Sequence, residues 1–444
     1  MKRYEKYKPS GVEWLGDVPN EWSVTKIKYI SELNPKKSNL EKLDQECSFI
    51  PMEKLKLGNL LLDETRQISE VYNSYTYFQN GDLLIAKVTP CFENKNFAIA
   101  NNLVNGIGFG SSEIYVLRSK NCFNRYLFYR LQENTFMDLA AGSMIGAGGL
   151  KRIPSDFLNN YVIALPPNEE QVSIANFLDK KTEKIDRLIS HQQALLEKLS
   201  EKRTALITET VCGRVRLPTA PNDNETLSGS NAPLRNSGIE WLGEVPEHWL
   251  ITRLKYVGEI VLGLTYSPED ITNDENAILV LRSSNVQNGK LLLNDNVYVN
   301  KDIPKKMQTT ENDILICSRN GSRALIGKCT VIEGDAIGQT FGAFMTVFRS
   351  PYKRFIYYVL SSELFKSQLG NYLTSTINQL TTQVLGNFEI AFPPESEQTT
   401  IVNYLDTETA KIDRLQHKIE RVIERLKEYR SALITQVVTG KVKV

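Results

Sequence analysis

The chain has 444 residues, of which 41% are hydrophobic, an ordinary proportion for a soluble globular protein. This length exceeds what one compact core usually holds, so we expect two or three domains. Lys and Arg total 53 and Asp and Glu total 52, so the net charge of +1 neither favours nor excludes a nucleic-acid partner. The amino terminus is polar and no apolar run approaches the ~18 residues of a membrane helix, which predicts a cytoplasmic protein without a membrane span.

The cysteines form no Cys-x-x-Cys pair, and the histidines do not cluster beside them, so a structural zinc site is disfavoured. We expect free thiols in a reducing compartment. The residues concerned are Cys47, Cys91, Cys122, Cys212, Cys317, Cys329, His191, His248 and His417.

The first predicted segment carries a block with two tryptophans, Trp14 and Trp22, in residues 10–22. Short apolar runs at 82–86 and 113–117 predict strands, because Gly- and Asn-rich turns separate them. A short helix is predicted near 124–139. Together these features predict a mixed α+β domain.

A long helix follows. Pro166-Pro167 marks its start and Gly213 its end, so about 42 residues form a rod of roughly 60 Å. Apolar residues recur in it every seven positions, as in helices that pack along a partner helix. The predicted seam residues of this helix are Leu178, Ile185, Leu188, Leu195, Leu199 and Leu206.

Residues 216–236 are rich in Pro, Asn, Ser and Gly and predict a flexible linker. The tryptophan block then recurs in residues 237–249 at an offset of 227, with Trp241 and Trp249. Strands are predicted at 277–281 and 313–317, and a short helix near 353–369. A second long helix runs from Pro393-Pro394 to Gly440. Its predicted seam residues are Leu405, Ile412, Leu415, Ile419, Val422, Leu426 and Leu433.

The chain is therefore two copies of one unit, each with a nearly constant frame around a variable interior. The predicted boundaries are 1–165 for the first block and interior, 166–215 for the first helix, 216–236 for the linker, 237–392 for the second block and interior, and 393–444 for the second helix. Sequence offsets drift between the interiors, which indicates small insertions and deletions in loops.

The two seams most simply pair with each other in an antiparallel coiled coil, which would relate the units by an approximate twofold axis. The alternatives are two helices packed on their own domains, or seams reserved for other subunits. The tryptophan blocks could stack on bases, but their repetition in the constant frame favours packing. The antiparallel arrangement places the block near Trp14 against Leu433, and the block near Trp241 against Leu206.

This pattern resembles the specificity subunits of type I restriction–modification systems. The resemblance covers essentially the whole chain and rests on motifs that occur twice. They are Pro166-Pro167-x-x-Glu170-Gln171, Pro393-Pro394-x-x-Glu397-Gln398, the Lys-Ile-Asp-Arg-Leu segments at 184–188 and 411–415, the Ala-Leu-Ile-Thr segments at 205–208 and 432–435, and the Trp-Leu-Gly openings.

The resemblance implies that the interiors are target-recognition domains, each reading one half of a split duplex DNA sequence. It implies that the helices separate these domains and dock two methyltransferase subunits, and that restriction subunits join this core. The chain itself would be non-catalytic and would bind no cofactor, since S-adenosylmethionine, ATP and Mg²⁺ belong to the partner subunits. Such a complex works in a bacterial or archaeal cytoplasm.

Neither interior is basic overall: residues 31–150 hold 12 Lys and Arg against 13 Asp and Glu, and residues 258–378 hold 12 against 12. A DNA-binding face therefore needs local segregation of charge. We expect it at the loop that follows the strand at 313–317, at the equivalent loop of the first copy, and at a second segment of each interior. The candidate DNA-binding residues are Lys87, Ser143, Lys151, Arg152, Arg319, Asn320, Arg323, Thr376 and Gln379.

The alternative functions find little support. Gly321 to Lys328 has the wrong spacing for a nucleotide-binding loop. Asp82 with Glu93-x-Lys95 resembles a metal-dependent nuclease motif, but the second copy keeps only Asp313. A pure coiled-coil scaffold would not need two divergent interiors. It would also show no salt-dependent DNA binding, whereas a nuclease would cut with magnesium alone.

Overall fold

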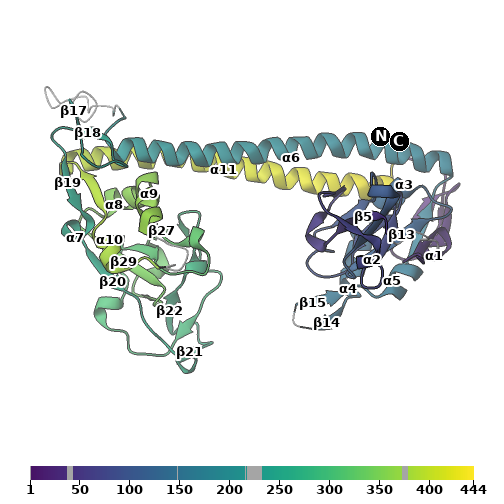
Figure 1. Ribbon diagram of the computed structural model, residues 1–444, viewed down its shortest axis with the longest axis horizontal. Helices are drawn as coiled ribbons and strands as arrows, with labels where there is room; N and C mark the ends of the chain where they lie inside the picture. The colour runs from purple at the N-terminus through teal and green to yellow at the C-terminus, as the bar shows by residue number, and fades with distance from the viewer. Residues whose placement is uncertain (1, 38–43, 148, 216, 218–232, 373–378) are drawn as a thin grey trace. The chain divides into compact units, whose positions relative to one another are not determined.

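A computed structural model of the protein describes residues 2–37, 44–147, 149–215, 217, 233–372 and 379–444. The chain divides into two compact units (Figure 1). Unit 1 comprises residues 1–193 and 420–444, and unit 2 comprises residues 194–419. Each unit combines a mixed α+β interior with one part of each long helix, α6 (Asn168–Val211) and α11 (Glu395–Val438). The predicted α+β class is confirmed.

The ends of both long helices follow from the repeated motifs. The buried side chain of Gln171 donates from Nε2 to the Pro166 carbonyl at 2.9 Å, and Gln398 does the same to Pro393 at 2.8 Å. These bonds fix the turn that enters each helix. Gly213 and Gly440 end the helices with φ of +73° and +72°, a conformation that favours glycine.

Within each unit the two helices run antiparallel, as predicted. In unit 1, Arg430 Nε lies 2.9 Å from Asp186 Oδ1, and in unit 2, Arg203 Nε lies 3.4 Å from Asp413 Oδ1. Both aspartates belong to the Lys-Ile-Asp-Arg-Leu segments, and the two pairs match at the offset of 227. The two units therefore share the same helix register, with equivalent ion pairs across the helices.

The predicted seam is only partly correct. The line through Leu178, Ile185, Leu405, Ile412, Ile419 and Leu433 is buried, and Leu199, Leu206 and Leu426 are half-buried. A second line of the heptads is exposed: Leu188 (51%), Leu195, Leu415 (48%) and Val422. On α11, Thr409 and Ile423 are buried and lie on the opposite side of the buried line from Leu415 and Val422. The helices thus pack through one side of a broad apolar face and leave the side with Leu188 and Leu415 exposed. The seven-residue period alone does not predict which side is buried.

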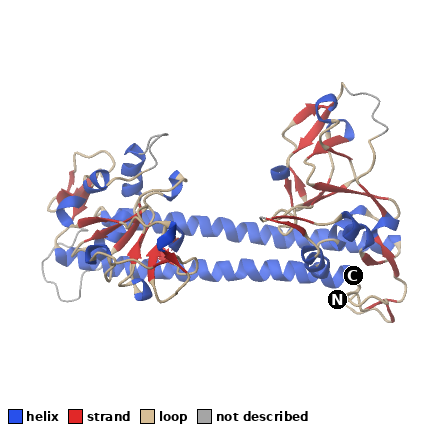
Figure 2. Ribbon diagram, turned by 90° about the horizontal axis from the view of Figure 1, so that it is seen from below, coloured by secondary structure: helices blue, strands red, loops and turns tan. Residues whose placement is uncertain are grey.

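The interior of unit 1 contains two four-stranded sheets (Figure 2), whose strands are named in the order in which they neighbour one another. The first is β11 (Phe97–Ile99), β10 (Leu83–Ala86), β13 (Ile114–Ser119) and β4 (Ser31–Leu33). The second is β8 (Thr65–Gln67), β5 (Glu46–Ile50), β12 (Ile107–Gly110) and β9 (Thr76–Gln79), in which β5 and β12 are parallel.

Unit 2 repeats most of this arrangement. Its first sheet is β27 (Cys329–Val331), β26 (Ile314–Cys317), β29 (Met345–Arg349) and β20 (Glu259–Leu262). Its second is β21 (Ile271–Thr272), β25 (Tyr298–Val299), β22 (Ile278–Leu281) and β28 (Thr340–Phe341), in which β22 and β28 are parallel.

The central strands explain the continuous apolar runs of the sequence. In β10, Leu83 and Ile85 enter one core, while Leu84 and Ala86 enter another on the opposite face. Strand β26 divides its side chains in the same way between two cores. Because both faces are covered, all four residues of each strand are apolar and buried.

The frame adds two-stranded pairs and short helices. The pairs in unit 1 are β1 (Tyr7–Pro9) with β2 (Asp17–Pro19), β3 (Ser23–Lys26) with β16 (Val162–Leu165), and β6 (Leu55–Lys56) with β7 (Asn59–Leu60). Those in unit 2 are β17 (Leu234–Asn236) with β18 (Glu244–Pro246), β19 (Leu250–Arg253) with β30 (Glu389–Phe392), and β23 (Val286–Gln287) with β24 (Lys290–Leu291). The short helices are α1 (Ile27–Ile30), α2 (Ile68–Val71), α5 (Ser155–Asn160), α7 (Leu254–Val257) and α10 (Thr382–Gly386).

The single short helix predicted in each interior is in fact two helices. In unit 1 these are α3 (Asn124–Arg130) and α4 (Asn134–Gly142), because Glu133 is extended and its carboxylate caps α4. In unit 2 they are α8 (Lys353–Leu360) and α9 (Glu363–Tyr372). The predicted linker also ends earlier than residue 236, since β17 is a strand, and its residues 216 and 218–232 lie outside the described part of the chain.

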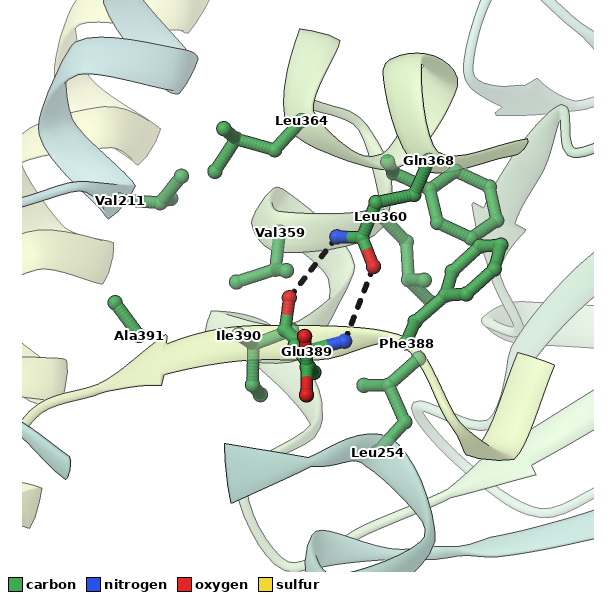
Figure 3. Close-up of a pocket in the computed structure, with 11 residues that line it drawn as sticks. Val211, Leu254, Val359, Leu360, Leu364, Gln368, Phe388, Glu389, Ile390 and Ala391 are labelled. Carbon is green, nitrogen blue, oxygen red and sulfur yellow. Dashed lines mark hydrogen bonds between the residues drawn. The ribbon is translucent and has the colours of Figure 1, made fainter. Parts of the chain in front are cut away.

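Helix α9 is fastened to the frame of unit 2 by one buried amide. Gln368 Nε2 donates to the Glu389 carbonyl at 2.9 Å, and Glu389 N donates to Gln368 Oε1 at 3.0 Å (Figure 3). Apolar side chains that include Val211 and Leu360 surround this joint and leave a cavity of about 10 Å³, too small for a ligand. Among the described residues, no helix is long and apolar enough to cross a membrane.

Candidate nucleic-acid interface

One buried tryptophan in each tryptophan block bonds to the start of a long helix. Trp22 Nε1 donates to Glu170 Oε2 at 3.0 Å, and Trp249 Nε1 donates to Glu397 Oε2 at 3.0 Å. The glutamates are those of the two Pro-Pro-x-x-Glu-Gln motifs. Trp22 shares a core with Leu433, and Trp249 shares one with Ile207, against which Leu206 also packs. The predicted packing of the blocks against the helix ends is confirmed.

The other two tryptophans differ from this pattern. Trp241 packs half-buried against the core of unit 2. Trp14 is 43% exposed and stacks on Tyr161 with ring centroids 6.0 Å apart. Trp14 therefore packs at the surface and not within a core. Its indole lies on the ring of Tyr161, which is a buried residue of the unit 1 core.

A second repeated contact holds each interior on its helix. Tyr129 donates to Asp179 Oδ1 at 2.6 Å in unit 1. In unit 2, Tyr358 donates to Asp406, and Arg354 Nη2 lies 2.9 Å from both carboxylate oxygens of Asp406. Because the contact involves two to three polar groups on one helical turn, it fixes the direction of each interior relative to the helix that carries it.

In unit 1, the structure brings together the two segments predicted to bind DNA. The loop after β10, residues 87–90, lies against strands β14 (Ile145–Ala147) and β15 (Leu150–Arg152). Thr89 N donates to the Lys151 carbonyl at 3.0 Å, and Lys151 N donates to Thr89 Oγ1 at 3.0 Å. These two segments form one surface.

The candidate residues on this surface differ in how available they are. Lys151 is exposed, and Lys87 is half-buried with Nζ 5.2 Å from the Tyr115 ring centroid. Both lysines carry a charge that suits a DNA phosphate.

Arg152 and Ser143 are already engaged within the chain. Arg152 donates from Nε and Nη2 to the two oxygens of Glu113 at 2.8 and 2.9 Å, and these bonds hold the pKa of Glu113 below its usual range. Ser143 Oγ donates to the Ala140 carbonyl at 2.8 Å at the end of α4. Base reading by Arg152 or Ser143 would require these bonds to break.

In unit 2, the predicted residues lie in a groove of about 1170 Å³. Arg319, Asn320 and Gln379 all line it, so the two predicted segments again come together. Arg319 and Gln379 pair through an isolated antiparallel bridge, as Val88 and Arg152 do in unit 1. Other groove residues lie before β21 (Tyr266 and Ser267), directly after β22 (Arg282), before β25 (Asp295) and after β28 (Phe344).

Arg319 is the best-placed candidate for base contact among the predicted residues of this groove. Its backbone N and that of Ser318 both donate to the Phe344 carbonyl, at 3.1 and 3.0 Å. Its guanidinium carbon lies 5.2 Å from the Phe344 ring centroid, and Arg319 is exposed. An arginine whose backbone is held in place and whose side chain is exposed is suited to bidentate bonding with guanine.

Two functional candidates in the groove were not predicted from the sequence. Phe344 is 58% exposed, and Arg282 donates from Nη2 to Asp295 at 3.0 Å. The available signal for Phe344 was the comparison of the copies, because the corresponding position of the first copy, at the local offset of 231, is Glu113. An apolar ring that stands where the other copy has a glutamate indicates a copy-specific role.

The remaining candidates of unit 2 are less free. Asn320 donates from Nδ2 to Ser283 Oγ at 3.0 Å and accepts from Ser322 N at 2.9 Å, so both ends of its amide are occupied. The expected bidentate grip on adenine is therefore unavailable in this conformation. Arg323 donates to the Gly370 carbonyl at 3.2 Å. Thr376 lies outside the described residues.

The nuclease-like motif is a structural ion pair. Asp82 is buried and accepts from Arg118 Nε and Nη2 at 2.8 and 2.7 Å. Asp313 accepts from Arg349 at 3.0 to 3.1 Å in the same place on the sheet of unit 2. An aspartate occupied by an arginine is not open to a metal ion. Among the described residues, no three His, Cys, Asp or Glu side chains cluster as metal ligands.

These features define a protein with two recognition surfaces, each mounted on a repeated helical frame. Comparison with known proteins agrees with this class. The model of the "type I restriction modification DNA specificity domain" matches residues 19–198 and 246–425. The chain belongs to this family, whose members are the DNA-recognition subunits, not the catalytic subunits, of type I restriction–modification systems.

Two relatives and one solved structure show how far the similarity extends. The EcoAI specificity subunit of Escherichia coli is 25% identical over 91% of this chain and 80% of the relative. The MjaVIII specificity subunit of Methanocaldococcus jannaschii is 25% identical over 96% of this chain and 94% of the relative. A chain from a structural study of the assembly and conformational transition of a type I system shares the fold, with a TM-score of 0.68, 16% identity and coverage of 96% and 99% of the two chains.

Proposed function

We propose that this chain reads a two-part duplex DNA sequence for a type I complex, with one unit for each half of the sequence. The observation that carries the proposal occurs in both units. The loop after β10 pairs with residue 152 in unit 1, and the loop after β26 pairs with residue 379 in unit 2. The paired segments form an exposed surface in unit 1 and line a groove in unit 2. The frames that hold these surfaces share equivalent contacts, such as Trp22 with Glu170 and Trp249 with Glu397. A similar frame that holds two different surfaces suits the reading of two different half-sites.

On this proposal, the long helices dock two methyltransferase subunits, and restriction subunits join through them. The support is the open flank of the apolar face. Leu188 and Leu415 are equivalent at the offset of 227 and are 51% and 48% exposed. Leu195 and Val422 form a second equivalent pair that is also exposed. Apolar residues repeated at the surface of both copies fit two copies of one partner.

The partner subunits then supply the chemistry, including S-adenosylmethionine, ATP and Mg²⁺, and the complex works in the cytoplasm, where its DNA is. The deciding experiment is to co-express the chain with a methyltransferase subunit of its own system and map methylated adenines across the host DNA. We expect one split motif, of which only one half changes when residues 31–150 are exchanged for those of a relative. A stable complex that methylates no motif would contradict the proposal.

Docking is tested by the double variant Leu188→Ser, Leu415→Ser. We expect the methyltransferase subunit to be lost during co-purification while the chain remains folded. The matched control is Leu61→Ser, since Leu61 is 45% exposed but lies in the interior of unit 1. Equal retention of the partner by both proteins would contradict docking on this flank.

A further inference from the structure

Strands β14 and β15 form an uncovered ribbon in unit 1. They pair antiparallel, with Ile145 opposite Arg152 and Ala147 opposite Leu150. All six residues of the two strands are exposed. Residues opposite one another in an antiparallel pair share a face, and alternate residues of a strand do as well. One face therefore carries Ile145, Ala147, Leu150 and Arg152, and the other carries Gly146 and Lys151.

The first of these faces is apolar and unusually open to water. Ile145 is 71% exposed and Leu150 is 57% exposed. Exposed apolar area is unfavourable by about 25 cal/mol per Å² relative to burial, so two large side chains on one ribbon indicate a binding surface. Neither residue contributes to the cores of the interior.

The ribbon is held firmly even though it is exposed. Thr89 Oγ1 accepts from Lys151 N at 3.0 Å and donates to the Gly149 carbonyl at 2.6 Å. The Arg152–Glu113 ion pair fixes the base of the ribbon to the loop before β13. Gly146 is required by its close approach to the other strand, because a Cβ at this position would lie 2.3 Å from the Leu150 carbonyl oxygen. The apolar face is thus presented in a defined geometry.

We propose that this ribbon enters the major groove of the first half-site and that Ile145 and Leu150 contact the C5-methyl groups of thymines. The inference rests on the proposed function. It is supported by the continuity of the ribbon with Lys87 and Lys151, whose charges suit phosphates, and by size. The major groove is about 12 Å wide and admits a two-stranded ribbon, whereas the minor groove is about 6 Å wide. The thymine methyl is the apolar group that base edges offer there.

The proposal makes reading in unit 1 partly apolar. It also gives Arg152 a positioning role in place of base contact, since its guanidinium is used to hold the ribbon on Glu113. Lys151, on the opposite face, is left free to contact the DNA backbone.

The test removes the apolar group from each side of the contact, the C5-methyl from the DNA and the side chain of Ile145 or Leu150 from the protein. Once the motif is mapped, each thymine of the first half-site is replaced by uracil, and the binding of the complete methyltransferase complex is measured for the wild-type chain and for Ile145→Ser, Leu150→Ser and Leu61→Ser. We expect at least one uracil to weaken wild-type binding about four-fold, the loss that corresponds to one buried methyl group of ~0.8 kcal/mol. The same uracil should have no effect on Ile145→Ser or Leu150→Ser, and its full effect on the Leu61→Ser control.

Several outcomes would overturn the inference. They are a first half-site that tolerates uracil at every thymine, a methyl effect that persists in both ribbon variants, and loss of the methyltransferase subunit from those variants, which would identify a protein partner for the apolar face. A variant that moves the ribbon without changing its apolar residues, Gly146→Ala, should lose the methyl effect too. If no split motif is found at all, the proposed function fails first; a motif without a methyl effect contradicts only the ribbon inference.

Discussion

The two units use the same frame but present different candidate DNA-binding surfaces. In the frame, the tryptophan–glutamate bond measures 3.0 Å in both units, and the pairs Asp186–Arg430 and Arg203–Asp413 occupy equivalent positions. The surfaces have little in common beyond their place in the fold. Unit 1 presents an apolar ribbon, and unit 2 presents a groove with Arg319 beside Phe344.

The divergence begins in the second sheet of each interior. The parallel pair of strands is kept, but the outer strand differs: β9 extends the sheet of unit 1 beside β12, whereas β21 extends that of unit 2 beside β25. The first sheet, which bears the buried Asp–Arg pairs, keeps its strand order. The two copies therefore differ mainly away from the residues that join each interior to the helices.

The largest expected effect tests the equivalence of the frames. Trp22→Ala and Trp249→Ala should each destabilise the protein by about 3–5 kcal/mol, since each indole is fully buried at a helix end. Urea unfolding of the full chain, followed by circular dichroism, measures the loss. The controls Trp22→Phe and Trp249→Phe keep most of the buried ring and should lose far less. If one alanine variant were tolerated and its counterpart were not, the frames would not be equivalent.

The next effect concerns the buried carboxylates. Asp82→Ala and Asp313→Ala should each cost about 2–3 kcal/mol, because each removes the carboxylate that pairs with an arginine. The value lies below that of a fully buried pair because the side chains of Arg118 and Arg349 are 26% and 22% exposed. The free energy of unfolding is measured as above.

The same variants separate a structural role from a metal-binding one. Magnesium should not change the stability of either the wild-type chain or Asp82→Ala. A magnesium-dependent stabilisation of the wild-type chain that Asp82→Ala abolishes would contradict the structural role.

Much of the frame could be predicted because it occurs twice. The repeat at an offset of 227 identified the tryptophan blocks, the helix starts and the helix ends. Antiparallel pairing of the helices then predicted that the first block lies near Leu433, and Trp22 shares a core with Leu433. Strands such as β10 were predictable from four consecutive apolar residues. The exposed flank of the helices was not, because Leu188 and Ile185 are equally apolar and only the packing geometry selects between them.

The reading surfaces were harder to predict for a different reason. The location of each loop could be predicted because it follows a strand. Whether its side chains are already hydrogen-bonded depends on partners distant in the sequence. Arg152 is occupied by Glu113, 39 residues away, and Asn320 is occupied by Ser283, 37 residues away. Charge and residue type identify a candidate, whereas availability is a property of the folded chain.

A third, smaller effect isolates the surface of unit 2. Arg319→Ala should weaken binding of the second half-site by about 1–3 kcal/mol, the contribution of one bidentate base contact. Methylation mapping should show relaxed sequence preference at one position of that half only. Arg323→Ala is the matched control, since the guanidinium of Arg323 bonds to the Gly370 carbonyl, and it should leave the motif unchanged. Relaxation in the first half-site would contradict the assignment of one unit to each half.

The smallest effect concerns the register of the helices. Charge reversal in Asp186→Arg should cost about 0.2–1 kcal/mol, because the ion pair with Arg430 lies at the surface of the helix pair and Asp186 is half exposed. The double variant Asp186→Arg, Arg430→Asp should recover the loss, because it restores opposite charges at the same positions. The equivalent variants at Asp413 and Arg203 should behave alike if one register serves both units. Recovery in one pair only would show that the two units, although built from the same residues, do not depend on the same contacts to align their helices.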